Sequence, residues 1–216
     1  TFSSLDISAN GNAGAGAAGQ GIDASTFAGA PGGNGLAGTG GTILLEAQSG
    51  GALTARTADS SASPGRVTLA ANGFAGIGGD GANGATNPVT GVGGAGGNGG
   101  NSGQGNGGSI SLVASGGTIS LGELQANANG VGQFGAVGGS GGAGAVPPNS
   151  PPMTPAGSNG AAGAFGNSGV GIGGSVELSA LTDEGGAIGG LTLGDTFIDV
   201  TGTMRFFDVS VPSVGG

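Results

Sequence analysis

Apolar and polar residues alternate in short runs, and the same runs recur along the chain. One signature, [LV]-x-x-x-A-N-G, begins at Leu5, Val67 and Leu124. Another, G-G-[ST]-[IV]-x-L-x-A, begins at Gly40, Gly107 and Gly173. An alternation with a period of two residues is typical of a half-buried strand. A further short apolar run follows each second signature after a turn. The pattern therefore predicts three short strands in each repeat.

The spacing of the signatures indicates a solenoid. The first signature recurs after 62 and 57 residues and the second after 67 and 66, so the segments between constant strands vary in length. We predict an all-β fold, a right-handed parallel β-helix of about three coils with ladders of like residues inside. Residues 1–216 form one solenoid domain in this prediction, with repeats at about 5–66, 67–123 and 124–202. Residues 203–216 depart from the pattern and are interpreted as a C-terminal cap or subunit-contact segment.

Long glycine-rich segments lie between the two signatures of each repeat. One interpretation is that they are flexible surface loops. The other is that they form extended three-residue glycine helices, close to polyproline II, that stack on one flank because every coil releases them at the same corner. Only glycine permits such a close approach of backbones. In the stacked arrangement, four aromatic residues of these segments are candidate contacts between flank and body: Phe27, Phe74, Phe134 and Phe165.

Composition limits the core and the partners. The chain has 216 residues, of which 59 are Gly and only 4% are aromatic, so a conventional core would be thin. A formal net charge of −9 argues against nucleic acid or anionic membrane surfaces as partners. There is no Cys, and no apolar run approaches the roughly 20 residues of a membrane helix, so we predict no membrane insertion. Because the chain starts at Thr1, we interpret it as a processed product or an excised segment of an extracellular or cell-surface protein.

The two signatures resemble the β-helical shaft of filamentous-haemagglutinin-type bacterial surface adhesins. The resemblance covers the strand segments of all three repeats and implies a large, Cys-poor protein exported by a two-partner or autotransporter route. The long glycine segments are unusual for that family. They look more like glycine-rich antifreeze proteins or the glycine-helix bundles of some phage tip adhesins. No catalytic motif follows from the resemblance.

The residues present do not favour catalysis. β-Helix enzymes that cut polysaccharides need clustered carboxylates, usually with basic or aromatic residues that hold the sugar. The chain has no His, Tyr or Trp, and its three arginines are scattered. We therefore predict neither an enzyme nor a cofactor. No metal site is predicted either; if calcium bound, its oxygen ligands would be Asp183, Glu184 and Asp195.

Assembly is the function that the pattern favours. A short solenoid exposes unpaired strands at both ends, and these edges template further pairing. Phe2 near one end and Met204, Phe206 and Phe207 near the other are the predicted subunit contacts of a head-to-tail homopolymer, although the two adjacent phenylalanines could instead cap the last coil. We expect a filament subunit or adhesin shaft segment, with a host or neighbouring-cell surface as a further partner. The alternative is a protein that binds ice or another repetitive surface; the mixed outward side chains argue against it.

Overall fold

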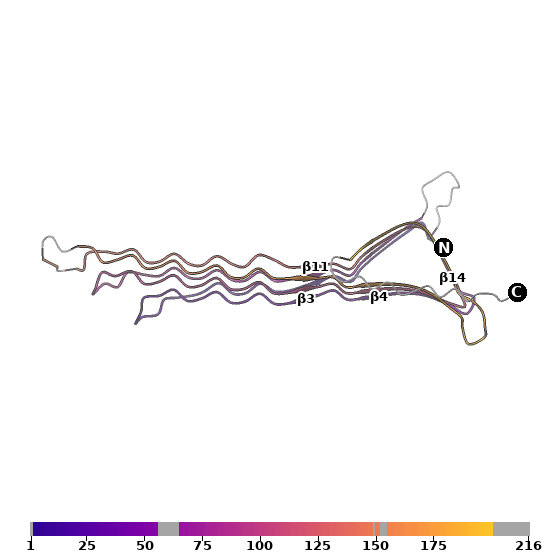
Figure 1. Ribbon diagram of the computed structural model, residues 1–216, viewed down its shortest axis with the longest axis horizontal. Coiled ribbons are helices and arrows are strands. Elements are labelled where there is room, and N and C mark those ends of the chain that lie inside the picture. The colour runs from indigo at the N-terminus through magenta and orange to yellow at the C-terminus, as the bar shows by residue number, and fades with distance from the viewer. Residues whose placement is uncertain (1, 56–64, 149, 152–154, 201–216) are drawn as a thin grey trace.

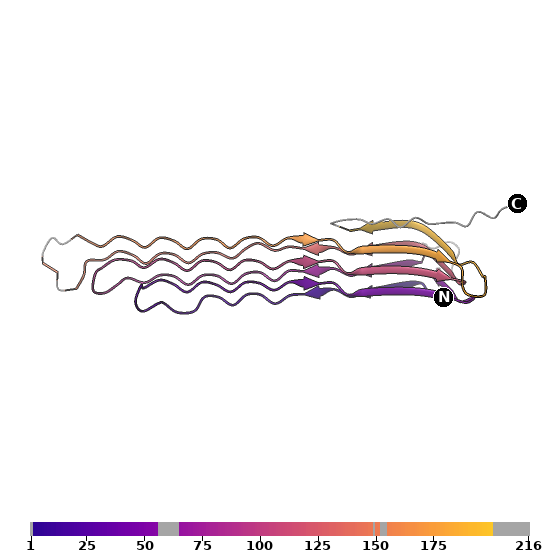
Figure 2. The ribbon, with the colours of Figure 1, turned by 60° about the horizontal axis from the view of Figure 1, so that its bottom comes forward.

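The computed structural model describes residues 2–55, 65–148, 150–151 and 155–200. These residues form strands joined by turns and long extended segments, with no helix among them. Every pair of named strands is parallel, and the strands form four stacked sheets. The arrangement is compatible with a β-solenoid, as the sequence predicted. We call the end of the stack at β1 the lower end and the end at β14 the upper end (Figure 2).

The β body consists of the longer strands, which enclose a triangular space at one end of the molecule (Figure 1). One side holds β4 (Thr42–Gln48), β9 (Ser109–Ser115) and β13 (Ser175–Leu181). The other two sides share a sheet of β1 (Ser4–Ser8), β5 (Ala52–Ala55), β6 (Arg66–Ala70), β10 (Thr118–Asn127) and β14 (Gly190–Asp199). Because β10 pairs with β5 along its first part and with β6 along its second, one strand lines two sides.

Ladders of like side chains fill the body. In the β4–β9–β13 sheet the register aligns Ile43 with Ile110 and Val176, and the leucines and alanines that follow are aligned in the same way. Such alignment confirms the predicted ladders. The middle coil is fully covered: Val67, Leu69, Ile110, Leu112 and Ile119 each have no exposed surface. Their apolar side chains alternate with outward polar ones, which is why these runs form strands.

Six glycine-rich tracts meet the body at one corner and extend far to one side, three of them leaving the body and three returning to it (Figures 1 and 2). We call residues 9–22, 71–86 and 128–146 the outgoing tracts, residues 28–41, 92–108 and 157–174 the returning tracts, and all six the glycine arm. Two three-stranded sheets of short strands mark its base: β2 (Gly11–Asn12), β7 (Gly73–Phe74) and β11 (Gly130–Val131) in the outgoing tracts, and β3 (Gly38–Thr39), β8 (Gly105–Asn106) and β12 (Gly171–Ile172) in the returning ones.

Backbone hydrogen bonds join the tracts with a period of three residues. Between returning tracts, the N–H groups of Gly29, Gly32 and Gly35 donate to carbonyls of the next coil at 2.8 Å. Between tracts of opposite direction, Gly94, Gly97 and Gly100 donate to Ala85, Ala82 and Gly79 at 2.7–2.8 Å. The tracts are thus mutually bonded and not isolated loops, since each satisfies the backbone groups of its neighbours.

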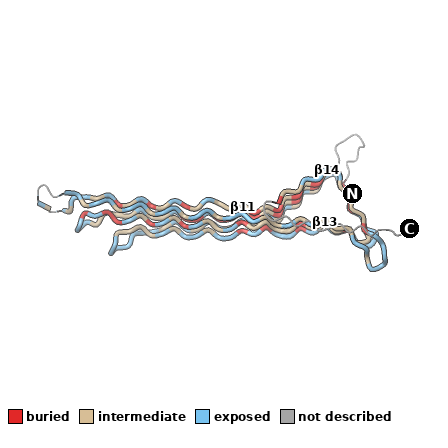
Figure 3. The backbone as a smooth tube through the Cα atoms, viewed as in Figure 1, coloured by how far each residue is buried: buried red, intermediate tan, exposed pale blue. Residues whose placement is uncertain are grey.

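Glycine is required where tracts touch. A Cβ atom on Gly97 would lie 2.1 Å from the Ala30 carbonyl oxygen, and one on Gly96 would lie 1.9 Å from that of Gly139. Buried positions consequently recur through the arm beside exposed ones (Figure 3). The prediction that Phe134 and Phe165 join the arm to the body is wrong. Their side chains are 84% and 76% exposed, because they lie on outer positions of the uppermost coil.

Candidate assembly surfaces

The lower end of the β body carries Phe2. Its N–H donates to the Thr54 carbonyl at 3.1 Å, and it forms an isolated parallel bridge with Ala55. The Phe2 side chain packs against the buried core of its own chain. Phe2 therefore sits at the end where the sequence placed a subunit contact. The other predicted contacts, Met204, Phe206 and Phe207, lie outside the described residues.

The core is less covered at both ends than in the middle. Leu112 is fully buried, whereas its ladder neighbours Leu45 below and Leu178 above are only partly buried. Other partly buried residues of the end coils that pack against the core are Leu5, Ile7, Leu53, Val176, Leu191, Leu193 and Ile198, whereas Ile43, Ala47 and Ala55 of the lowest coil are buried. On the outer face of the last strand, Phe197 is 58% exposed. Each end thus presents apolar side chains beside an open strand edge.

An asparagine ladder joins successive coils at the junction between the body and the arm. The Asn72 N–H donates to Asn10 Oδ1, and the Asn129 N–H donates to Asn72 Oδ1, both at 2.8 Å. Above them, Asn129 Nδ2 donates to Asp199 Oδ2 at 3.0 Å. The repeated A-N-G tripeptide marked these asparagines in the sequence, but their role depends on residues that are far apart in the chain.

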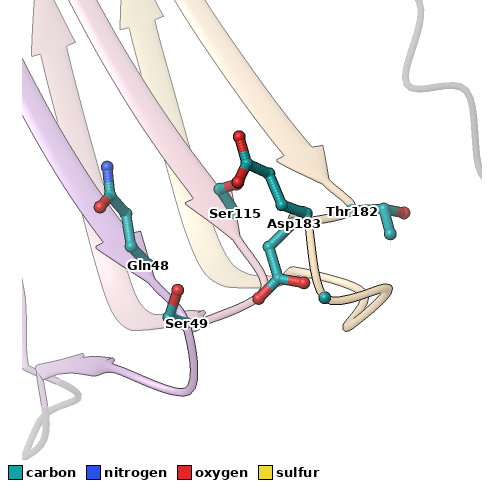
Figure 4. A pocket seen from close by; sticks show the side chains of 7 residues that line it. Gln48, Ser49, Ser115, Thr182 and Asp183 are labelled. Atoms are coloured by element: carbon teal, nitrogen blue, oxygen red, sulfur yellow. The ribbon is translucent and has the colours of Figure 1, made fainter.

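The predicted calcium ligands do not gather in one place. Asp183 lines an open hollow of about 400 Å³ at a corner of the body, together with Glu184, Gln48 and Ser115 (Figure 4). Its Oδ1 accepts the N–H of Ala187 at 2.8 Å within its own turn. Asp195, by contrast, lies on β14 in register with Glu123. Among the described residues no three acidic side chains come together to hold a metal ion.

The neighbours of Asp195 form a charged row on the outer face of the body. Arg66 Nε lies 3.5 Å from Glu123 Oε1, and Arg66 also donates to Gln125. Glu123 and Arg66 are aligned on adjacent strands, with Asp195 one strand above. Both charged partners of this pair are about half exposed, so the ion pair contributes little to stability. The row orders outward side chains but forms no site.

The first two coils end in the same distal turn. The Phe27 N–H donates to the Asp23 carbonyl at 2.7 Å, and the Gly91 N–H donates to that of Asn87 at 2.8 Å. The side-chain oxygen of Asp23 or Asn87 accepts N–H groups two and three residues ahead. The hydroxyl and N–H of Ser25 hold the pKa of the Asp23 carboxyl below its usual value.

One distal turn is strained and the other is not. The residue that closes the turn has φ of 71° at Gly91 but 56° at Phe27. Glycine adopts this left-handed conformation freely, whereas a bulky residue there is an outlier. The first turn therefore keeps an aromatic side chain at a position where the backbone favours glycine.

Comparisons of the chain with family models, with curated proteins and with solved structures find no match. Within the described ranges, none of the chain forms a helix with the length and apolar character needed to cross a bilayer.

Proposed function

We propose that the protein is an extracellular structural protein, a filament subunit or adhesin shaft segment in which β rungs stack end to end. The observation that carries the proposal is the partial burial of the core ladders at both ends of the body. Apolar area removed from water at these ends would stabilise stacking by about 25 cal/mol per Å². Repeat proteins of this kind stay soluble only if their terminal coils are covered or capped.

The two ends are matched in sequence. β13 carries Val176, Leu178 and Ala180 at the upper end of the ladders, and β4 carries Ile43, Leu45 and Ala47 at the lower end. Both strands have seven residues and take equivalent registers on β9. A second copy whose β4 lay on β13 would continue each ladder with a residue of the same kind. Such a head-to-tail contact leaves a free edge on every added copy and propagates without closing.

We further propose that the coil is right-handed and that the tracts of the arm are left-handed, three-residue extended helices. Parallel strands joined by a crossover are right-handed in about 98% of cases. The three-residue hydrogen-bond period of the arm supports the second assignment, because an extended helix of this class has three residues per turn. Vibrational circular dichroism of the isolated protein would test it, and a spectrum without a contribution from such helices would contradict it.

Composition supports the location. The net charge of −9, the absence of cysteine and the high glycine content suit an exported protein that crosses a membrane unfolded. A host or neighbouring-cell surface is the partner that an adhesin shaft would meet. Labelling of intact cells with an antibody against the protein would test this location.

Electron microscopy over a range of protein concentrations tests the stacking. We expect unbranched filaments that lengthen with concentration. Leu178→Lys places a charge on an upper ladder position and should abolish them, whereas Ser175→Lys, an outward and exposed position on the same strand, should not. Monomers at every concentration, or equal assembly by the two variants, would contradict the proposal.

Binding to a repetitive surface such as ice is the second candidate. The outer face of the returning tracts carries small exposed residues at every third position, among them Ala95 and Asn98 beside Ala161 and Ala164. Regular ranks of small side chains suit a periodic surface. Thermal hysteresis in a solution of monomeric protein would favour this function over stacking.

A further inference from the structure

The packing of the glycine arm makes one position in three face the coil above. In the first returning tract these positions are Gly29, Gly32 and Gly35, whose added Cβ atoms would lie 1.9, 1.7 and 2.1 Å from carbonyl oxygens of the second outgoing tract. In the second returning tract they are Gly93, Gly96 and Gly99, with corresponding distances of 1.9, 1.9 and 2.2 Å to the third outgoing tract. Real Cβ atoms do not approach so closely, so an overlying tract demands glycine at these positions.

The third returning tract breaks this rule. Gly160 and Gly94 are equivalent, because each donates its N–H across to the outgoing tract of its own coil. The residues that precede such glycines in the third tract are Asn159, Ala162 and Phe165, where the second tract has three glycines. All three are exposed. Near the body the substitution stops: Ser102 has its counterpart in Ser168, and Gly105 in Gly171.

One of these side chains substitutes directly for the missing tract. In the second coil, the N–H groups of Gly81 and Gly84 donate upward to Val137 and Ser140 of the third outgoing tract. Gly144 belongs to the same row of donors one coil higher, and its N–H donates to Asn159 Oδ1 at 2.7 Å. The N–H groups of Gly135, Gly138 and Gly141 in that row make no hydrogen bond to another described residue.

The lower face is obstructed as well. Gly97 and Gly103 of the second returning tract face downward, each with an added Cβ about 2 Å from the carbonyl oxygen of Ala30 or Leu36. At the corresponding positions of the first returning tract stand Ala30 and Leu36 themselves, and the leucine is 64% exposed. In the first outgoing tract, Ala17 is the counterpart of Gly79, whose added Cβ would lie 1.9 Å from the Ala17 carbonyl oxygen, and the exposed Gln20 follows three residues later. The lower carbonyls of Ala15, Ala18 and Asn34 accept no hydrogen bond from a described residue.

We infer that Asn159, Ala162 and Phe165 close the upper face of the glycine arm against a further glycine tract, as the residues at 17, 20, 30 and 36 close the lower face. The two faces offer complementary rows, N–H groups above and carbonyl groups below, and the side chains keep a second copy from joining them. Copies that stack through their β bodies therefore hold their arms apart beyond the base. Only this last consequence rests on the proposed stacking; the closure of the arm does not.

The test removes the closing side chains in a Leu178→Lys background, which prevents stacking through the body. The upper face is opened by Asn159→Gly, Ala162→Gly and Phe165→Gly. The lower face is opened by Ala17→Gly, Gln20→Gly, Ala30→Gly and Leu36→Gly. In sedimentation velocity, we expect the background protein and each singly opened variant to be monomeric. The doubly opened variant should form dimers and larger species as concentration rises.

Association of the background protein through its arm, mapped by hydrogen exchange, would overturn the inference. A monomeric doubly opened variant with a protected arm would overturn it too. If seven added glycines unfold the arm, a single pair decides instead. Gly99→Phe puts a side chain at the covered equivalent of Phe165 and should lower exchange protection in the second returning tract by about tenfold or more. Phe165→Gly should leave that protection unchanged. Equal protection in the two variants would contradict the inference that Phe165 closes the upper face.

Discussion

The N–H of Asn129 donates to the side-chain oxygen of Asn72, which lies 57 residues earlier in the chain and one coil below, at a distance of 2.8 Å. The bond repeats the one between Asn72 and Asn10, so each coil holds the next at the junction between body and arm. Local sequence cannot form such a contact, because it needs two passes of the chain in register.

Asn72→Ala should destabilise the protein by about 1–3 kcal/mol, because it leaves the partly buried N–H of Asn129 without this acceptor. Chemical denaturation would measure the change. Asn101→Ala is the matched control, since it removes the same type of bond to the Asn167 N–H on an exposed tract. Water can replace that acceptor, so its cost should be smaller. Equal losses of unfolding free energy in the two variants would show that the asparagine bond at the junction stabilises the protein no more than the exposed one does.

Gly97→Ala should destabilise the arm by roughly 1–3 kcal/mol, because the added methyl group meets the Ala30 carbonyl oxygen at 2.1 Å. Gly14→Ala is the control, since its methyl group would have only a Leu36 methyl at 3.6 Å as a neighbour. Gly14→Ala should be neutral or slightly stabilising, as it restricts the unfolded chain. Thermal unfolding distinguishes the two, and equal melting temperatures would argue against close packing of the tracts.

Phe27→Gly should stabilise the first distal turn. The change relieves about 1–2 kcal/mol of strain from the left-handed backbone conformation. The larger entropy that glycine loses on folding offsets about 0.5–1 kcal/mol of this gain. Gly91→Ala at the equivalent position of the second turn should have the opposite effect. Hydrogen exchange of the turn amides measures both. A loss of protection in Phe27→Gly would mean that the aromatic ring stabilises the turn more than the backbone strain weakens it.

The first distal turn should loosen in acid. The pKa of Asp23 is lowered in the folded state, so its contribution is present above the unfolded pKa of about 3.9 and is lost as pH falls through the lower, folded value. Exchange of the Ser25 and Thr26 amides should therefore rise below about pH 4. Asp23→Asn, which copies the Asn87 turn, should remove this dependence. A rise that persists in Asp23→Asn would assign it to another group.

The alternation of apolar residues was sufficient to predict the body. Ile43, Leu45 and Ala47 have their partners in the next coil at a constant spacing, so the ladders follow from local pattern and repeat length together. The glycine segments were harder to interpret. Their composition allowed loops or stacked tracts, because a glycine by itself does not show which carbonyl will face it.

The candidate contacts were less predictable still. Phe134 and Phe165 were predicted to contact the body because they lie in the glycine segments, yet both face solvent on the last coil. Asp183 and Asp195 appeared close in sequence, but a corner turn and part of a strand separate them. For the two phenylalanines, the deciding factor is the number of coils above them. For the two aspartates, it is the direction of the chain between them.

The sequence by itself determined the strands, their inward faces and the repeat, because a two-residue period and a recurring signature are local properties of a chain. Only the tertiary structure decided which glycine in each triplet is covered, which amide each asparagine accepts and where the arm ends. Those outcomes depend on neighbours contributed by other coils, some 60 residues away. Asn159 shows the difference: in sequence it is one polar residue in a glycine tract, and in the structure its side chain accepts the N–H of Gly144 from the outgoing tract of its own coil.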